Sequence, residues 1–377
     1  MDFGFSEEQE MLRDAARRFL ADNCPTTFVR KMMDHPTAHD AALWGKIVEL
    51  GWTAILIPEE YGGLGGSFLD MTVILEEAGK TLMPGPFFSS SVLGAAAIVE
   101  GGSDALKTAV LPKIAGGEYL ATLAIPETSG RFDAAGIALE AKKSGDGYVL
   151  TGEKFFVPDA HVAESIAVAV RTAPGGADGI TLLLVDAVTP GITITQLKTV
   201  DMTRRLAHVR FDGVKVGADR VLGAENGGWP IAARLIDIAA TALAVELVGT
   251  AQRALDLSVE YARTRVQFGK PIGSFQAIKH KCVDMMVAVE NARSLAYYAA
   301  WAIDQRAEDE HTAVAMAKAY ASDMAKNVTS EAIQVHGGIG FTWEHDMHLF
   351  HRRALAGEAN FGNAPAHRET VAKSLLD

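Results

Sequence analysis

The order in which hydrophobic patterns change along the chain constrains its fold more than any single motif does. Apolar residues recur at helical spacing from residue 1 to about 118, short β-rich runs fill 119–222, and helical spacing returns over 223–377. The strands are contiguous and no GxGxxG lies between a strand and a helix, which argues against a Rossmann fold. The pattern predicts an α+β protein with a helical domain over 1–118, a β domain over 119–222 and a second helical domain over 223–377.

Helix signals within the two helical blocks define the expected elements. Ser6 followed by Gln9 is a capping box at the start of the first helix. The other helices are expected over 41–50, 69–82, 91–100, 104–114, 231–264, 275–305 and 311–336, with a last one past His351.

Charge and cysteine content exclude several classes of protein. The 377 residues carry 35 Lys and Arg against 47 Asp and Glu, a net charge of −12, which argues against binding to nucleic acid or to an anionic membrane. Cys24 and Cys282 alone cannot make a disulfide scaffold or a zinc knuckle. The start lacks a basic apolar leader, and the most apolar stretch, 238–251, is interrupted at Glu246. We expect a soluble protein of the reducing cytoplasm.

Two places in the C-terminal block have the chemistry of a phosphate or cofactor site. A basic turn, YARTRVQFGKPIGSFQAIKH over 261–280, suits a pyrophosphate, although a solvated helix end would have similar charges. In IQVHGGIGF, the glycines Gly337, Gly338 and Gly340 would let a ligand approach the backbone. The histidines that follow, at 345, 348 and 351, lack the spacing of a metal motif such as HExxH, so no metal is expected.

Six motifs occur in a fixed order along the chain. They are DFGFSEEQEMLRDAARRF, LIPEEYGGLGG (56–66), GYVLTGEKFFVPDA (147–160), GADRVLGAENGGW, RVQFGKPIGSFQ (265–276) and QVHGGIGF (334–341). In this order and spacing they resemble the acyl-CoA dehydrogenase family over essentially the whole chain. The resemblance implies an N-terminal helical domain, a middle β-barrel or sandwich domain, a C-terminal four-helix bundle and the cofactor FAD.

The resemblance also implies a site shared between subunits. In the family, the residues of RxxFGxxxxxxQ and QxxGG reach across an interface to the FAD of a neighbouring chain. Carried over, these residues are Arg265, Phe268, Gln276, Gln334, Gly337 and Gly338. We therefore expect an oligomer, either a homotetramer or an α2β2 heterotetramer with a second chain of this type. Its substrate would be an acyl-CoA, in lipid β-oxidation or steroid degradation, and its electron acceptor an electron-transfer flavoprotein.

The chain departs from the family pattern where the chemistry occurs. The usual positions of the catalytic carboxylate align with Phe361 and Ala239. The Thr-Glu-Pro run beside the flavin appears as Ala124, Ile125 and Pro126 followed by ETSGRFD, and the Trp-Ile-Thr run as Phe156, Val157 and Pro158. Two hydroxyls expected near the flavin are therefore missing.

Removal of the α proton of a thioester requires a base, and Glu246 is our main candidate. It lies two turns after Ala239 on approximately the same face of an apolar helix. The alternative is a structural carboxylate held by an Arg or a Lys of a neighbouring helix. Glu358 is the second candidate base, and Asp237 is expected to be a cap or a surface group.

Two hypotheses about function remain open. In the first, the chain is a self-sufficient dehydrogenase that forms a trans-2-enoyl-CoA, with Glu246 as the base. In the second, it is a non-catalytic or half-site subunit that supports FAD bound by a partner chain. The heteromeric branch of the family acts on bulky acids such as steroid side chains.

Overall fold

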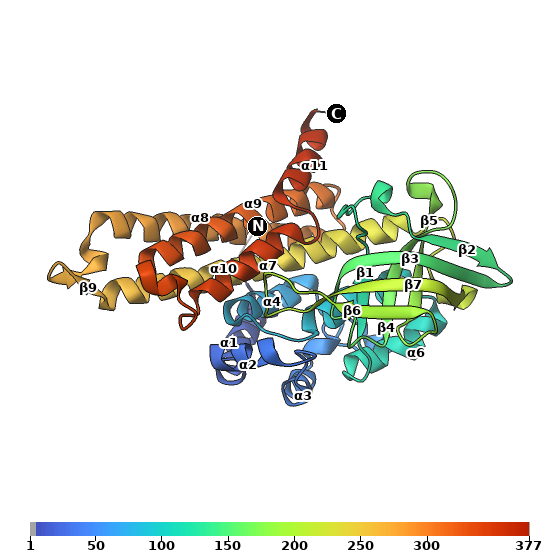
Figure 1. Cartoon of the computed structure of the whole chain (residues 1–377), viewed down its shortest axis with the longest axis horizontal. Coiled ribbons are helices and arrows are strands. Elements are labelled where there is room, and N and C mark those ends of the chain that lie inside the picture. The colour runs from blue at the N-terminus through green and yellow to red at the C-terminus, as the bar shows by residue number, and fades with distance from the viewer. Residues whose placement is uncertain (1–4, 377) are drawn as a thin grey trace.

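Helices form the N-terminal region of the computed structural model, which describes residues 5–376 (Figure 1). They are α1 (Glu7–Asn23), α2 (Thr26–Asp34), α3 (Ala41–Glu49), α4 (Phe68–Thr81), α5 (Ala95–Gly101) and α6 (Asp104–Ala115). The predicted capping box is present, with the Gln9 N–H donating to Ser6 Oγ at 3.2 Å. Helix α2 was not predicted, although Val29, Met32 and Met33 bury one face of it. The segment expected to be helical over 91–100 begins earlier, as a π-helix over Phe87–Gly94.

The middle region folds into one sheet of eight strands. Its strands are β1 (Ala121–Ala124), β2 (Glu140–Ser144), β3 (Gly147–Pro158), β4 (Ser165–Arg171), β5 (Ile180–Asp186), β6 (Ile192–Gln196), β7 (Leu206–Gly217) and β8 (Val221–Leu222). They are ordered β6-β7-β3-β2-β4-β5-β8, and β1 pairs with β4 in parallel. Strands β4 and β5 are buried along almost their whole length, whereas β3 and β7 alternate between buried and exposed residues.

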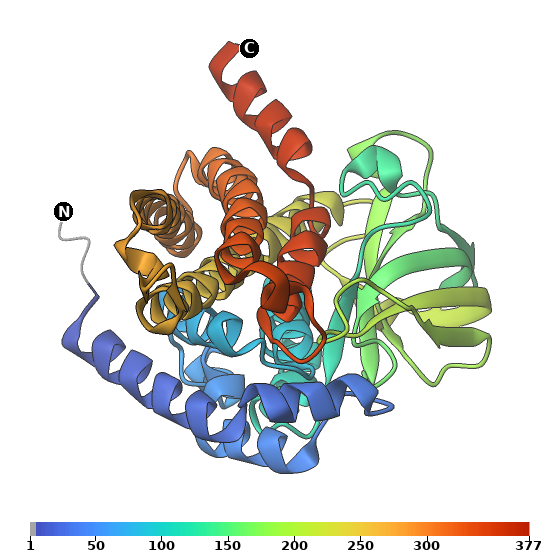
Figure 2. The same cartoon turned by 60° about the vertical axis from the view of Figure 1, so that its left-hand side comes forward.

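Long helices form the C-terminal region. They are α7 (Trp229–Thr264), α8 (Gln276–Gln305), α9 (Glu310–His336), α10 (Met347–Ala359) and α11 (Ala364–Leu376). A hairpin of β9 (Val266–Gln267) and β10 (Lys270–Pro271) joins α7 to α8 at one end of the bundle. Helix α11 projects from the body of the molecule (Figure 2). The order of helical, β and helical regions confirms the predicted fold class.

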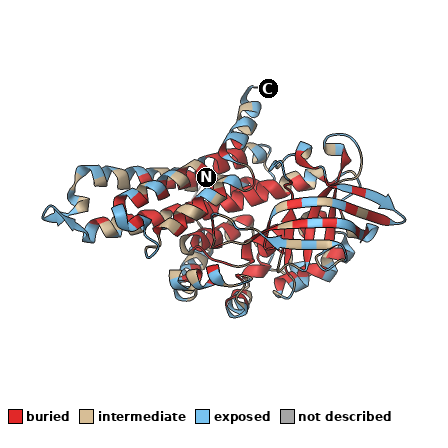
Figure 3. Ribbon diagram, in the orientation of Figure 1, coloured by how far each residue is buried: buried red, intermediate tan, exposed pale blue. Residues whose placement is uncertain are grey.

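Helix α7 connects the C-terminal bundle to the N-terminal region. It is buried on all sides from Leu235 to Ala251, so that it lies at the centre of the molecule (Figure 3). Two glycines allow α4 and α7 to touch directly. A Cβ atom at Gly79 would lie 2.2 Å from the carbonyl oxygen of Glu246, and one at Gly249 would lie 1.9 Å from that of Glu76. Only glycine permits this approach of the two backbones.

Among the helices of residues 5–376, none is both long and apolar enough to cross a membrane.

Candidate active site

An aromatic cluster occupies the neighbourhood of the position where the family carries its base. Phe361 is 6% exposed and follows α10 with a left-handed backbone, φ 55°. Its ring centroid lies 5.4 Å from that of Phe132 and 6.1 Å from that of Phe88. Ala239, at the alternative position of the base, is fully buried in α7. Neither position offers a group that could remove a proton.

Glu246 lies close to this cluster and is paired with an arginine. Nη2 of Arg204 donates to both carboxylate oxygens of Glu246, at 2.7 and 2.8 Å. The Arg204 guanidinium also lies 4.6 Å from the centroid of the Phe88 ring, and Glu246 is 3% exposed. Burial opposes the charge of Arg204, but Glu246 outweighs it and raises the pKa of the guanidinium. The sequence suggests an Arg or a Lys of a neighbouring helix as the structural partner of Glu246. The partner is an arginine, but it lies in the segment between β6 and β7 and not on a helix.

The other two carboxylates named in the sequence lie elsewhere. Glu358 is 3.6 Å from Lys326 of α9, which makes it a partner in an ion pair. The prediction that Asp237 is a cap or a surface group is wrong, because Asp237 is 7% exposed and its Oδ2 lies 2.9 Å from Nδ1 of His311. Burial raises the pKa of Asp237 although His311 opposes this.

The flavin-side segments of this chain lack two side chains that the resemblance places beside a flavin. Ala124 and Pro158 stand where the resemblance places the two threonine hydroxyls, and Pro158 also has no N–H to donate. The nearby backbone carbonyls already accept hydrogen bonds. The carbonyl of Pro158 accepts from the Thr122 hydroxyl at 2.7 Å, and that of Pro126 accepts from the Phe155 N–H at 2.9 Å. No chemical step is therefore derived from a flavin bound to these segments.

The residues predicted to reach a neighbouring FAD do fit such a role. Phe268 is 91% exposed, and the glycine pair Gly337 and Gly338 has open space where a Cβ would be. Arg265 is exposed, and its side chain makes no hydrogen bond or ion pair within residues 5–376. Gln276 and Gln334 are also exposed.

The two cross-subunit motifs lie at the same end of the bundle. Tyr261, in the last turns of α7, stacks on His336 at the end of α9 with ring centroids 4.7 Å apart. Lys270 of the basic turn lies over the Phe275 ring, and Lys281, directly after the turn, is bound to Glu331. Arg265 is thus an exposed cation without an ion pair in the described part of the chain, at the same end of the bundle as the open glycine pair.

The three histidines after the glycine loop do not assemble a metal site. His351 Nδ1 is 2.9 Å from the Thr329 hydroxyl, and His345 Nδ1 accepts from the Met347 N–H at 3.1 Å. Over residues 5–376, no group of three or more His, Cys, Asp or Glu side chains is arranged to bind a metal ion.

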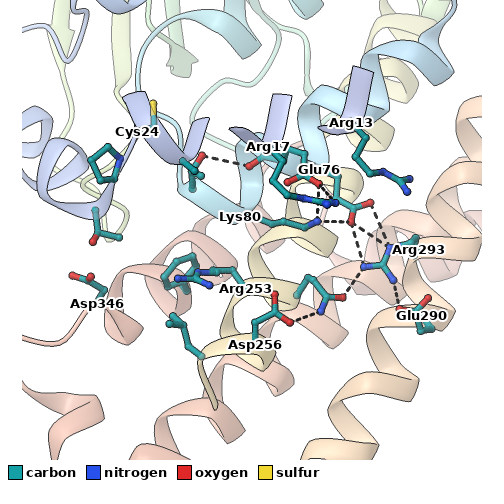
Figure 4. Close-up of a pocket in the computed structure, with 18 residues that line it drawn as sticks. Arg13, Arg17, Cys24, Glu76, Lys80, Arg253, Asp256, Glu290, Arg293 and Asp346 are labelled. Atoms are coloured by element: carbon teal, nitrogen blue, oxygen red, sulfur yellow. Dashed lines mark hydrogen bonds and ion pairs between the residues drawn. The ribbon is translucent and has the colours of Figure 1, made fainter. Parts of the chain in front are cut away.

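A cleft of about 830 Å³ opens between α1, α4, α7 and α8 (Figure 4). A network of charges fixes its wall, since Glu76 is paired with Arg293 and Lys80, and Glu77 with Arg17 and Lys80. Arg253 points into the cleft, exposed and without an ion pair within the described part of the chain. The cleft is not lined by Phe361, Phe88 or Glu246, and it lies outside the predicted site.

The order of three domains is that of an acyl-CoA dehydrogenase fold. Family models for the N-terminal, middle and C-terminal domains of acyl-CoA dehydrogenase match residues 6–118, 122–214 and 226–376. The chain belongs to the acyl-CoA dehydrogenase family, whose members are FAD-dependent enzymes.

Relatives and solved structures agree with this assignment. The chain is 36% identical to acyl-CoA dehydrogenase IpdE2 of Mycolicibacterium smegmatis over 93% of each protein. It is similar to the structure of butyryl-CoA dehydrogenase from Megasphaera elsdenii, with 31% identity, a TM-score of 0.93 and full coverage of both chains. It is also similar to a chain of the ChsE4-ChsE5 complex from Mycobacterium tuberculosis, with 28% identity, a TM-score of 0.91 and coverage of 100% of this chain and 99% of that one.

Proposed function

We propose that this chain is the supporting half of a heteromeric, FAD-dependent acyl-CoA dehydrogenase. The complex would convert an acyl-CoA thioester to its trans-2-enoyl-CoA and pass electrons to an electron-transfer flavoprotein. The observation that carries the proposal is the packing of Phe361 against Phe132 and Phe88, where the family has a base. The two missing hydroxyls at Ala124 and Pro158 support the same conclusion. The similarity to a chain of the two-component ChsE4-ChsE5 complex supports the α2β2 arrangement.

In this proposal the chain's own residues bind and orient a cofactor in the partner's site. Bound FAD supplies the hydride acceptor of the desaturation. Arg265 would neutralise negative charge on the phosphates, because its guanidinium is free and exposed. The open glycine pair Gly337 and Gly338 would let a ligand approach the backbone N–H groups. The partner would supply the base.

The resemblance to the heteromeric branch of the family supports a proposal for the substrate class. The heteromeric branch acts on bulky acyl groups such as steroid side chains, and the relative IpdE2 is a mycobacterial acyl-CoA dehydrogenase. We assign this chain to the same class of substrate. Cys24 and Cys282 are both free thiols, which is compatible with work in a reducing cytoplasm.

Flavin stoichiometry tests the proposal. The full chain is expressed alone and together with a second family member, and the flavin-to-protein ratio and the mass in solution are measured. We expect a colourless product alone and about one FAD per two chains in the complex. A yellow homotetramer with about one FAD per chain would contradict the proposal.

A second candidate function is desaturation in this chain with Glu246 as the base. The observation that favours it is the burial of Glu246 on α7, separated from Phe361 by Arg204 and Phe88. The Glu246→Gln variant of the complex separates the two functions. Loss of turnover with full flavin content would support Glu246 as the base, whereas unchanged turnover per flavin supports the supporting-half proposal.

A further inference from the structure

Helices α7 and α8 run side by side in the C-terminal bundle (Figure 1), and a groove of about 660 Å³ follows their surface. One face of α7 forms its first wall, because the lining residues recur at helical spacing from Gln252 through Leu255 and Val259 to Arg263. Residues 252–263 of this wall extend about 18 Å, which is room for about three turns of another helix.

The floor of the groove is apolar and partly exposed. Leu255 and Val259 of α7 line it together with Cys282, Val283 and Met286 of α8. Val283 and Met286 are each 52% exposed. Apolar side chains that gather in an open groove mark a surface that another molecule covers. Their spacing on two neighbouring helices suits an amphipathic helix laid into the groove.

The rim of the groove is acidic. Asp256 and Glu260 lie one turn apart on α7, both are exposed, and neither forms an ion pair within residues 5–376. Glu290 of α8 is paired with Arg293. Arg263 is the one cation among the described residues that line the groove, so the rim keeps an excess of negative charge.

Two features favour a chain other than a second copy of this one as the occupant. In a symmetric contact between two copies, both surfaces would carry the same excess of negative charge, whereas a chain with Lys or Arg beside its apolar residues would neutralise it. The groove also ends at Thr264, directly before Arg265, which the proposed function places against the FAD of the partner chain.

We propose that the groove between α7 and α8 is the docking site for a basic amphipathic helix of the flavin-binding partner chain. The inference rests on the proposed function, because that function supplies the second chain. Apolar side chains of the docked helix cover Val283 and Met286, and its Lys or Arg side chains pair with Asp256 and Glu260.

The reactivity of Cys282 reports whether the groove is covered. Its thiol lines the groove and is half-buried, whereas Cys24 is 1% exposed and burial raises the pKa of Cys24 to about 12, so that Cys24 stays unreactive. Burial also raises the pKa of Cys282, so the thiols are modified with N-ethylmaleimide at mildly alkaline pH. Mass spectrometry follows Cys282 in the chain alone and in its complex with a second family member. We expect modification on the order of tenfold slower in the complex, and equal rates would overturn the inference.

Neutralising the rim tests the charge of the occupant. Asp256→Asn combined with Glu260→Gln should slow association with the partner chain about tenfold at low salt and flatten its dependence on salt. The control, Asp146→Asn combined with Asp178→Asn, removes two exposed carboxylates from turns of the sheet and should leave the rate unchanged. The same rate in both double variants would contradict a basic occupant.

Flavin content and mass, measured on the same samples, separate this inference from the proposed function. A complex with about one FAD per two chains and a fully reactive Cys282 would overturn the docking site and leave the proposed function standing. A yellow homotetramer with a protected Cys282 would mean that a second copy covers the groove, and would overturn both.

Discussion

Arg204 holds the carboxylate of Glu246 through a single nitrogen, Nη2, at 2.7 and 2.8 Å. Removing one partner leaves a buried charge unpaired, so Arg204→Met should cost about 3–5 kcal/mol in the free energy of unfolding. The double variant Arg204→Met with Glu246→Leu should recover most of this loss. Urea denaturation of the two variants and the parent measures both effects. The complex that contains the double variant should turn over as fast as the parent complex. Loss of turnover would instead support Glu246 as the base.

Restoring the carboxylate at residue 361 should not create activity. Phe361→Glu places a carboxylate among the rings of Phe132 and Phe88, beside an arginine, Arg204, that is already paired with Glu246, and this should lower stability by about 3 kcal/mol. Phe361→Leu, the control, loses only packing and should cost about 1 kcal/mol. Unfolding by urea and turnover per flavin of the complex check this. A gain of activity by Phe361→Glu would mean that this chain retains a working flavin site.

Arg265→Ala should lower the FAD content of the complex without changing the stability of the chain. Its guanidinium is exposed and makes no ion pair within the described residues, so the fold does not depend on it. We expect the affinity of the complex for FAD to fall at least tenfold, because a charge-assisted contact to phosphate is lost. Flavin titration and thermal unfolding of the chain measure the two effects. Arg263→Ala, two residues away on an exposed face, is the matched control.

Lys318 should make the stability of the chain depend on alkaline pH. Burial lowers the pKa of Lys318 to about 7 from an ordinary value of 10.5, although Glu358 opposes this. Between about pH 7 and 10.5 the unfolded chain keeps a proton that the folded chain has lost. The free energy of unfolding should therefore rise with pH across this window. Urea unfolding at several pH values should show a flatter profile for Lys318→Met than for the parent, and parallel profiles would contradict the prediction.

Gly249→Ala should separate α4 from α7. The added methyl group would lie 1.9 Å from the carbonyl oxygen of Glu76, and neither backbone can move away without disturbing the core. We expect a loss of about 2 kcal/mol or more in the free energy of unfolding. Gly45→Ala, at an open position of α3, should leave stability nearly unchanged or raise it. Similar losses in both variants would show that the helix contact is not the cause.

The sequence was informative about the fold because its signals are local. Helical spacing, the Ser6 capping box and the turn clusters each act within a few residues, and the family motifs added the order of the domains. Helix α2 was not predicted because it has only nine residues and its N-cap residue, Pro25, has no capping side chain.

The surroundings of the candidate site could not be predicted in the same way. Phe88, Phe132 and Phe361 are far apart in the sequence and meet only through tertiary packing. Glu246 could be recognised as an unusual buried charge, but its partner Arg204 lies on a loop that carries no local signal of this contact. The cross-subunit residues were placed by their motifs, and their role in binding FAD stays a prediction.

Helix α7 has a consequence for how the chain is made. Its 36 residues extend about 54 Å, and its buried face completes the packing of α4. During synthesis from the N-terminus, the apolar surface of α4 leaves the ribosome more than 150 residues before the end of α7 does. Until α7 is synthesised, the hydrophobic face of α4 stays exposed to solvent. A fragment that ends before Trp229 should therefore aggregate and not fold as a separate domain. The topology of this fold therefore requires that the face be shielded during synthesis, by a chaperone or by early collapse onto other helices.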